Sequence, residues 1–226
     1  MAASKVILIL GAGANVGASI AKKFASHGYK VAVTNRGNTK LDESYLTIKA
    51  DLSQPGNVKH VFATVEKEYG ISPGVIVYNA AHAHNTRTDP LALSQSQLEF
   101  DMAVNVTSAY LSAQEAVRAF GKLPADSPKS FIYTGNGLNA KPLPSLMSLG
   151  LSKSAMAHVL ETAVIAYKDR NWTFYYCDER QPDGDFMYDA LSGDAHAEVY
   201  WNLSQDGGQR EVMHTFVSGK GYTQFP

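Results

Sequence analysis

The sequence is poor in cysteine and in net charge, and it has no long apolar run. Its 226 residues contain one cysteine, Cys177, which excludes an internal disulfide and suits a reducing compartment. The net charge of −1 offers no basic surface to nucleic acid or to an anionic membrane. No segment approaches the ~20 apolar residues of a membrane span, and a strand expected within the first residues leaves no room for a signal peptide. We therefore expect a cytoplasmic protein that binds neither nucleic acid nor membranes.

What the sequence does have is a regular alternation of short apolar segments with longer amphipathic ones. The apolar segments are the expected strands, near residues 5–10, 30–35, 45–50, 74–78, 130–134, 172–176 and 212–217. Helices are expected after the first strand and over 55–69, 100–120, 146–167 and 194–203. Strands that alternate with helices predict a parallel sheet covered on both faces. We therefore predict a single α/β domain over residues 1–226, with a doubly wound, Rossmann-type sheet of about seven strands.

The most informative segment is a glycine-rich turn that joins the first expected strand, residues 5–10, to a helical pattern. Gly11 lets the chain turn sharply, and Gly13 lets the backbone approach a phosphate. Gly17 lets the helix lie close to the strand. The free N–H groups and the positive dipole end of this helix then face a negatively charged ligand. A strand, a tight turn and a helix N-terminus in this order predict a dinucleotide site.

Polar residues follow the next strands, at the edge where parallel strands place their ligands. After the second strand, where an acidic residue would bind a ribose 2′-hydroxyl, the chain has Asn35 and Arg36, and a guanidinium pairs with a 2′-phosphate. We therefore expect NADP(H) rather than NAD(H), the alternative being an arginine solvated in a polar loop. Asp51 follows the third strand and suits the adenine amino group. The expected cofactor contacts are Gly11, Gly13, Asn15, Val16, Gly17, Asn35, Arg36, Asp51, Leu52, Asn79, Ala80 and Ala81.

Four of these features together resemble the short-chain dehydrogenase/reductase family, over nearly the full length of the chain. Residues 11–17 (Gly-Ala-Gly-Ala-Asn-Val-Gly) are similar to the family's glycine motif, with Asn15 in place of its middle glycine. Asp51 matches the family's adenine-contacting aspartate, and residues 79–81 (Asn-Ala-Ala) resemble its Asn-Asn-Ala-Gly motif. Asn105 matches the asparagine of the family's catalytic tetrad. The resemblance implies a Rossmann-type fold and a nicotinamide cofactor.

The catalytic half of the family pattern is only partly present. Residues 149–155 resemble the family's Tyr-x-x-x-Lys segment and retain Lys153, but Leu149 stands where the family has tyrosine. Asn136 stands where the family's serine is expected. In the family, the tyrosine exchanges the proton of the carbonyl oxygen, the lysine lowers its pKa and holds the nicotinamide ribose, and the serine positions the carbonyl. The resemblance thus implies catalytic roles for Asn105, Asn136 and Lys153, and a further cofactor contact by Lys153.

A replacement for the tyrosine is left open by the sequence. Leucine has no exchangeable proton, so proton transfer cannot run through position 149. The candidates are Ser148, Tyr133, Tyr176 and a chain from Lys153 through water to Asn105. For each tyrosine, a structural role is favoured over a catalytic one. Reduction of an iminium or of an activated alkene would need no strong acid.

These features predict an NADP(H)-dependent oxidoreductase that acts on a small carbonyl, imine or activated alkene through a non-standard proton donor. The alternatives are a non-redox biosynthetic enzyme and a cofactor-binding regulatory protein on the same fold. His82 and His84 follow the fourth strand, as general acids near the cofactor or as solvated loop residues. Because no acidic residue has metal-ligand spacing to these histidines, we expect no metal.

The C-terminal part and the two long helices carry the remaining expectations. Residues 178–180 (Asp-Glu-Arg) follow the sixth strand, where they either rim the pocket or pair with one another. The segment of about 177–211 resembles family segments that close the substrate pocket. In the family, helices corresponding to 100–120 and 146–167 form a four-helix interface, so we expect a homodimer or homotetramer, the alternative being a monomer core.

Overall fold

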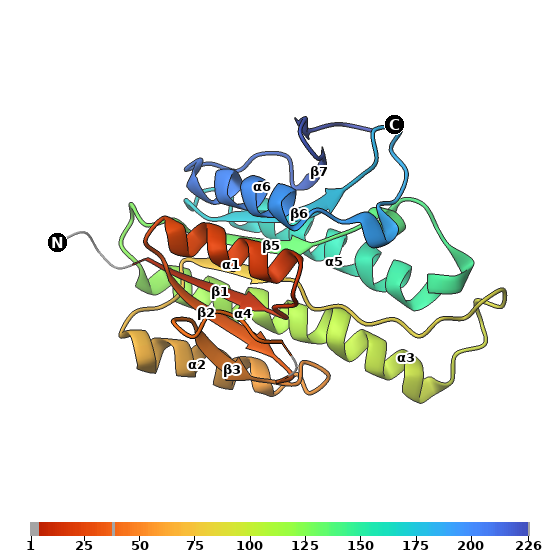
Figure 1. The fold of residues 1–226 in the computed structure, drawn as a ribbon, viewed down its shortest axis with the longest axis horizontal. Helices are drawn as coiled ribbons and strands as arrows, with labels where there is room; N and C mark the ends of the chain where they lie inside the picture. Colours follow the sequence, from red (N-terminus) through yellow and green to blue (C-terminus); the bar gives the residue numbers. More distant parts are fainter. Residues whose placement is uncertain (1–4, 38, 226) are drawn as a thin grey trace.

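The computed structural model describes residues 5–37 and 39–225, which form one eight-stranded sheet between two layers of helices (Figure 1). The strands are β1 (Val6–Leu10), β2 (Lys30–Asn35), β3 (Leu46–Lys49), β4 (Val75–Tyr78), β5 (Ser130–Thr134), β6 (Thr173–Glu179), β7 (Met213–Val217) and β8 (Gly221–Tyr222). The α-helices are α1 (Val16–Ser26), α2 (Asn57–Tyr69), α3 (Gln95–Met102), α4 (Ser108–Lys122), α5 (Met147–Ala166) and α6 (Gly193–Gln205). None of the helices in this part of the chain combines the length and the apolar character that a membrane crossing requires.

The strand order is β3-β2-β1-β4-β5-β6-β7-β8, and the pairings from β3 to β7 are all parallel. The chain first runs outward from β1 to β3 and then crosses back to β4 on the other side of β1. This reversal opens a crevice at the carboxyl ends of β1 and β4, the place where α/β sheets bind ligands. The predicted doubly wound α/β fold is confirmed. The strand beyond the expected seven is β8, a two-residue segment that pairs antiparallel with β7 and is too short for a periodic signal.

Alternate residues of β1 face opposite layers, and both layers are buried. Leu8 and Leu10 belong to the core under α2, α4 and α5, whereas Ile7 and Ile9 belong to the core under α1 and α6. All five residues of β1 are buried, as expected for a central strand with a helical layer on each side. The sheet is thereby fixed on both faces, and the strand ends hold the ligand-binding edge in place.

The single helix expected over residues 100–120 is three consecutive segments instead. A capping box at Ser94 starts α3 earlier, and a π-helical turn over Ala103–Thr107 separates α3 from α4. A π turn shifts the backbone hydrogen bonds by one residue. The carbonyl oxygens in this turn have partners from the sheet, because the Tyr78 hydroxyl donates to Val104 and the Tyr133 hydroxyl donates to Asn105. Both tyrosines are buried, so their hydroxyls need such acceptors.

Candidate functional site

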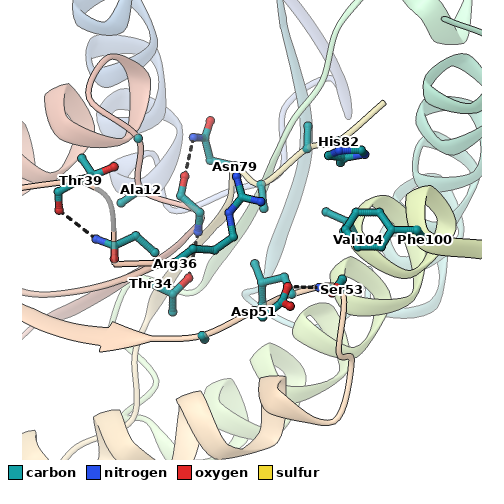
Figure 2. Close-up of a pocket in the computed structure, with 17 residues that line it drawn as sticks. Ala12, Thr34, Arg36, Thr39, Asp51, Ser53, Asn79, His82, Phe100 and Val104 are labelled. Atoms are coloured by element: carbon teal, nitrogen blue, oxygen red, sulfur yellow. Dashed lines mark hydrogen bonds between the residues drawn. The ribbon is translucent and has the colours of Figure 1, made fainter. Parts of the chain in front are cut away.

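A cavity of about 350 Å³ lies at the carboxyl ends of β1, β2, β3 and β4 (Figure 2). Its volume is at the lower end of the range for small-molecule sites. Most of the predicted cofactor contacts meet there. The described residues that line it are Gly11, Ala12, Gly13, Thr34, Asn35, Arg36, Thr39, Ala50, Asp51, Leu52, Ser53, Asn79, Ala80, Ala81, His82, Phe100 and Val104.

The glycine-rich turn forms one wall of the cavity. Gly11 has a φ of +88°, and a Cβ atom on it would lie 2.6 Å from backbone atoms of Ala80, so both conformation and space require glycine. Its N–H donates to the Thr34 hydroxyl (3.0 Å), and its carbonyl accepts from the Asn79 amide (2.9 Å). Gly13 is exposed, and a Cβ atom there would meet nothing within 4 Å. The open space above Gly13 suits a group such as a diphosphate.

Asn15, Val16 and Gly17 support the turn from below and do not belong to the described lining of the cavity. Val16 and Gly17 are buried, and a Cβ atom on Gly17 would lie 2.6 Å from the Ala12 Cα. The Asn15 side chain donates to the Leu191 carbonyl (2.9 Å) and accepts from the Gly193 N–H (3.1 Å). This amide therefore joins the turn to the start of α6. Asn15 is the residue that stands in place of the middle glycine of the family motif.

The opposite wall comes from the residues after β2 and β3. The exposed Arg36 extends into the cavity (Figure 2) and makes no ion pair with the described residues. Asn35 shapes the loop, since its side chain accepts from the Gly37 N–H (2.7 Å) and donates to the Thr39 carbonyl (3.3 Å). Asp51 is exposed, and its carboxylate accepts one hydrogen bond from the described residues, donated by the Ser53 N–H (2.9 Å). A free guanidinium and a carboxylate thus face the same cavity.

The three predicted catalytic residues lie outside the described lining of the cavity. Asn105 is buried in the π turn, and its amide accepts from the His82 N–H (2.9 Å) and donates to the His82 carbonyl (2.6 Å). Asn136 accepts from the Leu138 N–H (3.1 Å) through its side-chain oxygen. Lys153 is buried on α5. The structure therefore gathers the predicted cofactor contacts more completely than the catalytic ones.

Comparison with known proteins agrees with this geometry. The sequence profile described as short chain dehydrogenase matches residues 5–173. The chain belongs to the short-chain dehydrogenase/reductase family. It is 40% identical over 236 residues to the short chain dehydrogenase/reductase dmxR12 of Cryptosporiopsis sp. (strain 8999), an alignment that covers 99% of this chain and 96% of the relative.

Solved structures show the same fold at lower identity. One is the 3-ketoacyl-(acyl-carrier-protein) reductase of Brucella melitensis complexed with NADH, with a TM-score of 0.76 and 19% identity over 95% of this chain and 97% of that one. Another is BdcA in complex with NADPH, with a TM-score of 0.72 and 18% identity over 98% and 96% of the two chains. The fold is thus that of proteins solved with either nicotinamide cofactor.

Lys153, which matches the lysine of this short-chain dehydrogenase/reductase motif, is turned into the protein. Its Nζ donates to the Thr134 carbonyl (2.7 Å) and lies 4.4 Å from the centre of the Tyr133 ring. Burial lowers its pKa to about 7, although the Asp178 carboxylate acts in the opposite direction. The amine therefore lies at the carboxyl end of β5, and Lys153 does not belong to the described lining of the cavity.

The hydroxyls considered as replacements for the family tyrosine are already engaged. Ser148 is buried and donates to Asp101 (2.5 Å), and Tyr176 donates to the Asn136 carbonyl (2.6 Å). Tyr133 donates to the carbonyl in the π turn. Burial raises the pKa values of Tyr133 and Tyr176, which makes them weaker acids. Leu149 itself is only partly buried.

Of the charged residues after Cys177, Asp178 and Glu179 belong to a strand and Arg180 follows it, and all three are buried instead of lining a pocket rim. We expected the strand to end at residue 176, but β6 continues to Glu179 and pairs with β7. Asp178 forms a buried ion pair with Arg180, which also donates to the Gly184 carbonyl (2.9 Å). Burial raises the pKa of Asp178 to about 6, against the lowering influence of Arg180 and Lys153. Of the two readings of residues 178–180, mutual pairing is right for Asp178 and Arg180, but it occurs inside the protein.

The sequence did not point to Asp101, which the structure places beside the two histidines. Asp101 is fully buried, and its Oδ1 accepts from Nδ1 of both His82 (2.7 Å) and His84 (2.9 Å). Asp101 therefore has metal-ligand spacing to His82 and His84, and the expectation that no acidic residue does is wrong. The spacing in the sequence could have indicated this contact, because Asp101 precedes Asn105 by about one helical turn and so lies on the same helix face. Residues 79–84 cross that face.

Proposed function

We propose that this short-chain dehydrogenase/reductase is an NADP(H)-dependent oxidoreductase acting on a small organic substrate, a carbonyl, imine or activated alkene. The observation that carries the proposal is the cavity between the glycine turn and Arg36, which has space above Gly13 and a free guanidinium. The cofactor would supply or accept a hydride. Gly11 and Gly13 would admit its diphosphate, Arg36 would pair with the 2′-phosphate, and Asp51 would accept from the adenine amino group.

Asn136 is the side chain best suited to hold the substrate carbonyl. Its oxygen is occupied by the Leu138 N–H, and its amide nitrogen donates no hydrogen bond to the described residues, which leaves two N–H groups to orient an acceptor. Because Leu149 donates no proton, we favour substrates whose reduction builds little negative charge on oxygen, such as an iminium or an activated alkene. Lys153 and Asn105 already make hydrogen bonds within the protein. To act on the substrate or the cofactor, they would have to exchange these hydrogen bonds for new ones.

A second candidate function is cofactor binding without redox turnover, in a regulatory protein or in a non-redox biosynthetic enzyme. The specific observation in its favour is the position of Lys153, which is buried and donates to Thr134 instead of facing the cavity. Binding and catalysis must therefore be measured separately.

The surroundings of the site extend the proposal. We propose that the chain forms one domain, that the part of the 177–211 segment that follows β6 closes the substrate pocket, and that the protein is cytoplasmic. We also propose a homodimer or homotetramer formed through α4 and α5, where Tyr110, Leu151 and Ile165 leave apolar surface exposed. Small molecules would be its other partners.

The decisive experiment is a fluorescence titration of the protein with NADPH and with NADH. We expect micromolar affinity for NADPH and weaker binding of NADH. Arg36→Gln is expected to weaken NADPH binding by about tenfold or more and to leave NADH binding unchanged, since only NADPH carries the 2′-phosphate. Lys40→Gln is the matched control, because it removes a neighbouring exposed charge outside the described lining of the cavity. If neither nucleotide binds, the proposal fails.

Turnover then separates the two candidate functions. Carbonyl, imine and alkene acceptors are screened for NADPH oxidation at saturating cofactor. Hydride transfer to any class supports the oxidoreductase, and tight NADPH binding without transfer to any of them supports the second candidate.

A further inference from the structure

The loop after β4 and the helix α3 bring two imidazoles and one carboxylate to a single point. The Nδ1 atoms of His82 and His84 lie 2.7 Å and 2.9 Å from the same oxygen of Asp101. One possible ligand atom from each residue lies within 4.8 Å of the others. The carboxylate is fully buried, whereas the two histidine side chains retain 35% and 29% of their exposure. Solvent therefore reaches the imidazoles, and the anion sits behind them.

This arrangement has the ligand types and the spacing of a transition-metal site. Zn²⁺ binds imidazole nitrogen and carboxylate oxygen at about 2.0–2.2 Å, which places tetrahedral ligand atoms roughly 3.3 Å apart. The observed N–O separations are close to that value, so small rotations of the His82 and His84 rings would suffice. Binding requires each Nδ1 to lose its proton, and a neutral imidazole can carry its proton on Nε2 instead. Two imidazoles favour Zn²⁺, Co²⁺ or Ni²⁺ over Mg²⁺ and Ca²⁺, which prefer oxygen ligands.

The neighbours of the cluster hold its groups in place. The second carboxylate oxygen of Asp101 accepts from the Ser148 hydroxyl (2.5 Å) and from the His84 N–H (3.0 Å), which leaves Oδ1 directed at the imidazoles. Asn105 holds the backbone of His82 through two hydrogen bonds. The Phe100 ring lies edge-on to both imidazoles. Such supporting hydrogen bonds orient ligands and raise metal affinity.

We propose that His82, His84 and Asp101 form a binding site for one divalent transition-metal ion of the zinc class. His82 also lines the cofactor cavity, so the ion would sit at the rim of that cavity. Three protein ligands leave a coordination position for water or for a substrate oxygen, as in catalytic rather than structural zinc sites. The site needs no nicotinamide cofactor, and its test is independent of the proposed oxidoreductase function.

The experiment is a competition titration of the full-length, chelator-treated protein with Zn²⁺ against a chromophoric zinc chelator at pH 7.5. We expect one equivalent bound with micromolar affinity, unaffected by excess Mg²⁺. His84→Ala is expected to weaken binding by more than about tenfold, and this partly exposed side chain is a mild change to the fold. The matched control is His158→Ala, an exposed histidine on α5, with affinity equal to that of the unaltered protein.

A second variant and a second metal keep the result clear. Asp101→Asn keeps the shape of the side chain but removes its charge, and thermal melting reports whether it folds. In a folded Asp101→Asn protein we expect the same loss of Zn²⁺ affinity. Co²⁺ should give visible ligand-field bands that His84→Ala lacks. Absence of saturable Zn²⁺ binding, or equal affinity in His84→Ala and the unaltered protein, would overturn the proposal and leave a hydrogen-bonded cluster.

Discussion

The carboxyl edge of the sheet has an open part and a closed part. At the ends of β1 to β4, an exposed glycine turn, a free guanidinium and an exposed carboxylate surround a cavity. At the ends of β5 and β6, the equally polar side chains of Lys153, Asp178 and Arg180 are 3%, 1% and 5% exposed and bind one another or backbone carbonyls. The same edge of one sheet therefore offers a preformed cavity in one part, whereas the other part is closed by internal ion pairs and hydrogen bonds, with one oxygen of Asp178 left without a partner among the described residues.

The difference separates binding from chemistry in this chain. A preformed cavity can take a ligand without breaking existing hydrogen bonds, which lowers the cost of binding. The closed part can take part in catalysis only after Lys153 leaves the Thr134 carbonyl, because buried polar groups must keep partners. Substitutions in the open part should thus change mainly ligand affinity, and substitutions in the closed part should change mainly the stability of the fold.

The largest effect is expected from Asp178→Asn in the closed part. Loss of this carboxylate leaves Arg180 as a buried cation without its ion-pair partner, and breaking a buried pair costs about 3–5 kcal/mol. Urea unfolding measures the loss. Asp189→Asn, an exposed position in the following segment, is the control and should stay within about 0.5 kcal/mol. Equal stability of the two variants would show that the closed part is not held by charge.

The next effect concerns pH and Lys153→Met. The folded-state pKa of Lys153 is lowered to about 7, whereas an unfolded lysine titrates near 10.4. Between these values the unfolded chain binds more protons, so this group makes stability rise with pH. Methionine removes that contribution. From pH 7 to pH 9, the free energy of unfolding of the unaltered protein should therefore rise by about 2 kcal/mol more than that of Lys153→Met.

Urea unfolding at the two pH values checks this prediction. Lys168→Met, at an exposed lysine after α5, should show no such change with pH. A pH-independent difference between Lys153→Met and the unaltered protein would mean that Lys153 is solvated and that the closed part is in fact open.

The smallest effect in free energy is expected in the open part, from Gly13→Ala. The added methyl group meets no protein atom within 4 Å, so stability should change by less than about 1 kcal/mol. It occupies the space offered to the diphosphate, and NADPH affinity should fall about tenfold, or about 1.4 kcal/mol. Fluorescence titration and thermal melting of the same sample give both values. Gly208→Ala, another glycine with open space around its Cβ position, should change neither.

The open part was predictable from the sequence because its residues follow strands directly. A glycine turn and the residues after each apolar segment locate Gly11, Arg36 and Asp51 without any tertiary information. The helical layers and the parallel sheet follow from the alternation of patterns in the same way. Local sequence signals and the final fold agree in this region, as they do in most of the chain.

The closed part was less predictable because tertiary partners decide it. Asp178 reads as a loop residue until Arg180 neutralises it and β7 pairs with its backbone. The π turn in the long helix depends on hydroxyls from Tyr78 and Tyr133, which are distant in sequence. The meeting of Asp101 with two loop histidines likewise depends on how one loop crosses one helix.

Because the sequence has a single cysteine, alkylation of Cys177 can report when the closed part opens. Cys177 lies on β6 next to Asp178 and is fully buried, and burial raises the pKa of its thiol well above the ordinary value. A thiol in this state reacts with an alkylating reagent only when the surrounding segment opens. The rate of labelling therefore measures how often β6 becomes exposed in the native protein. No second thiol in the sequence competes for the reagent.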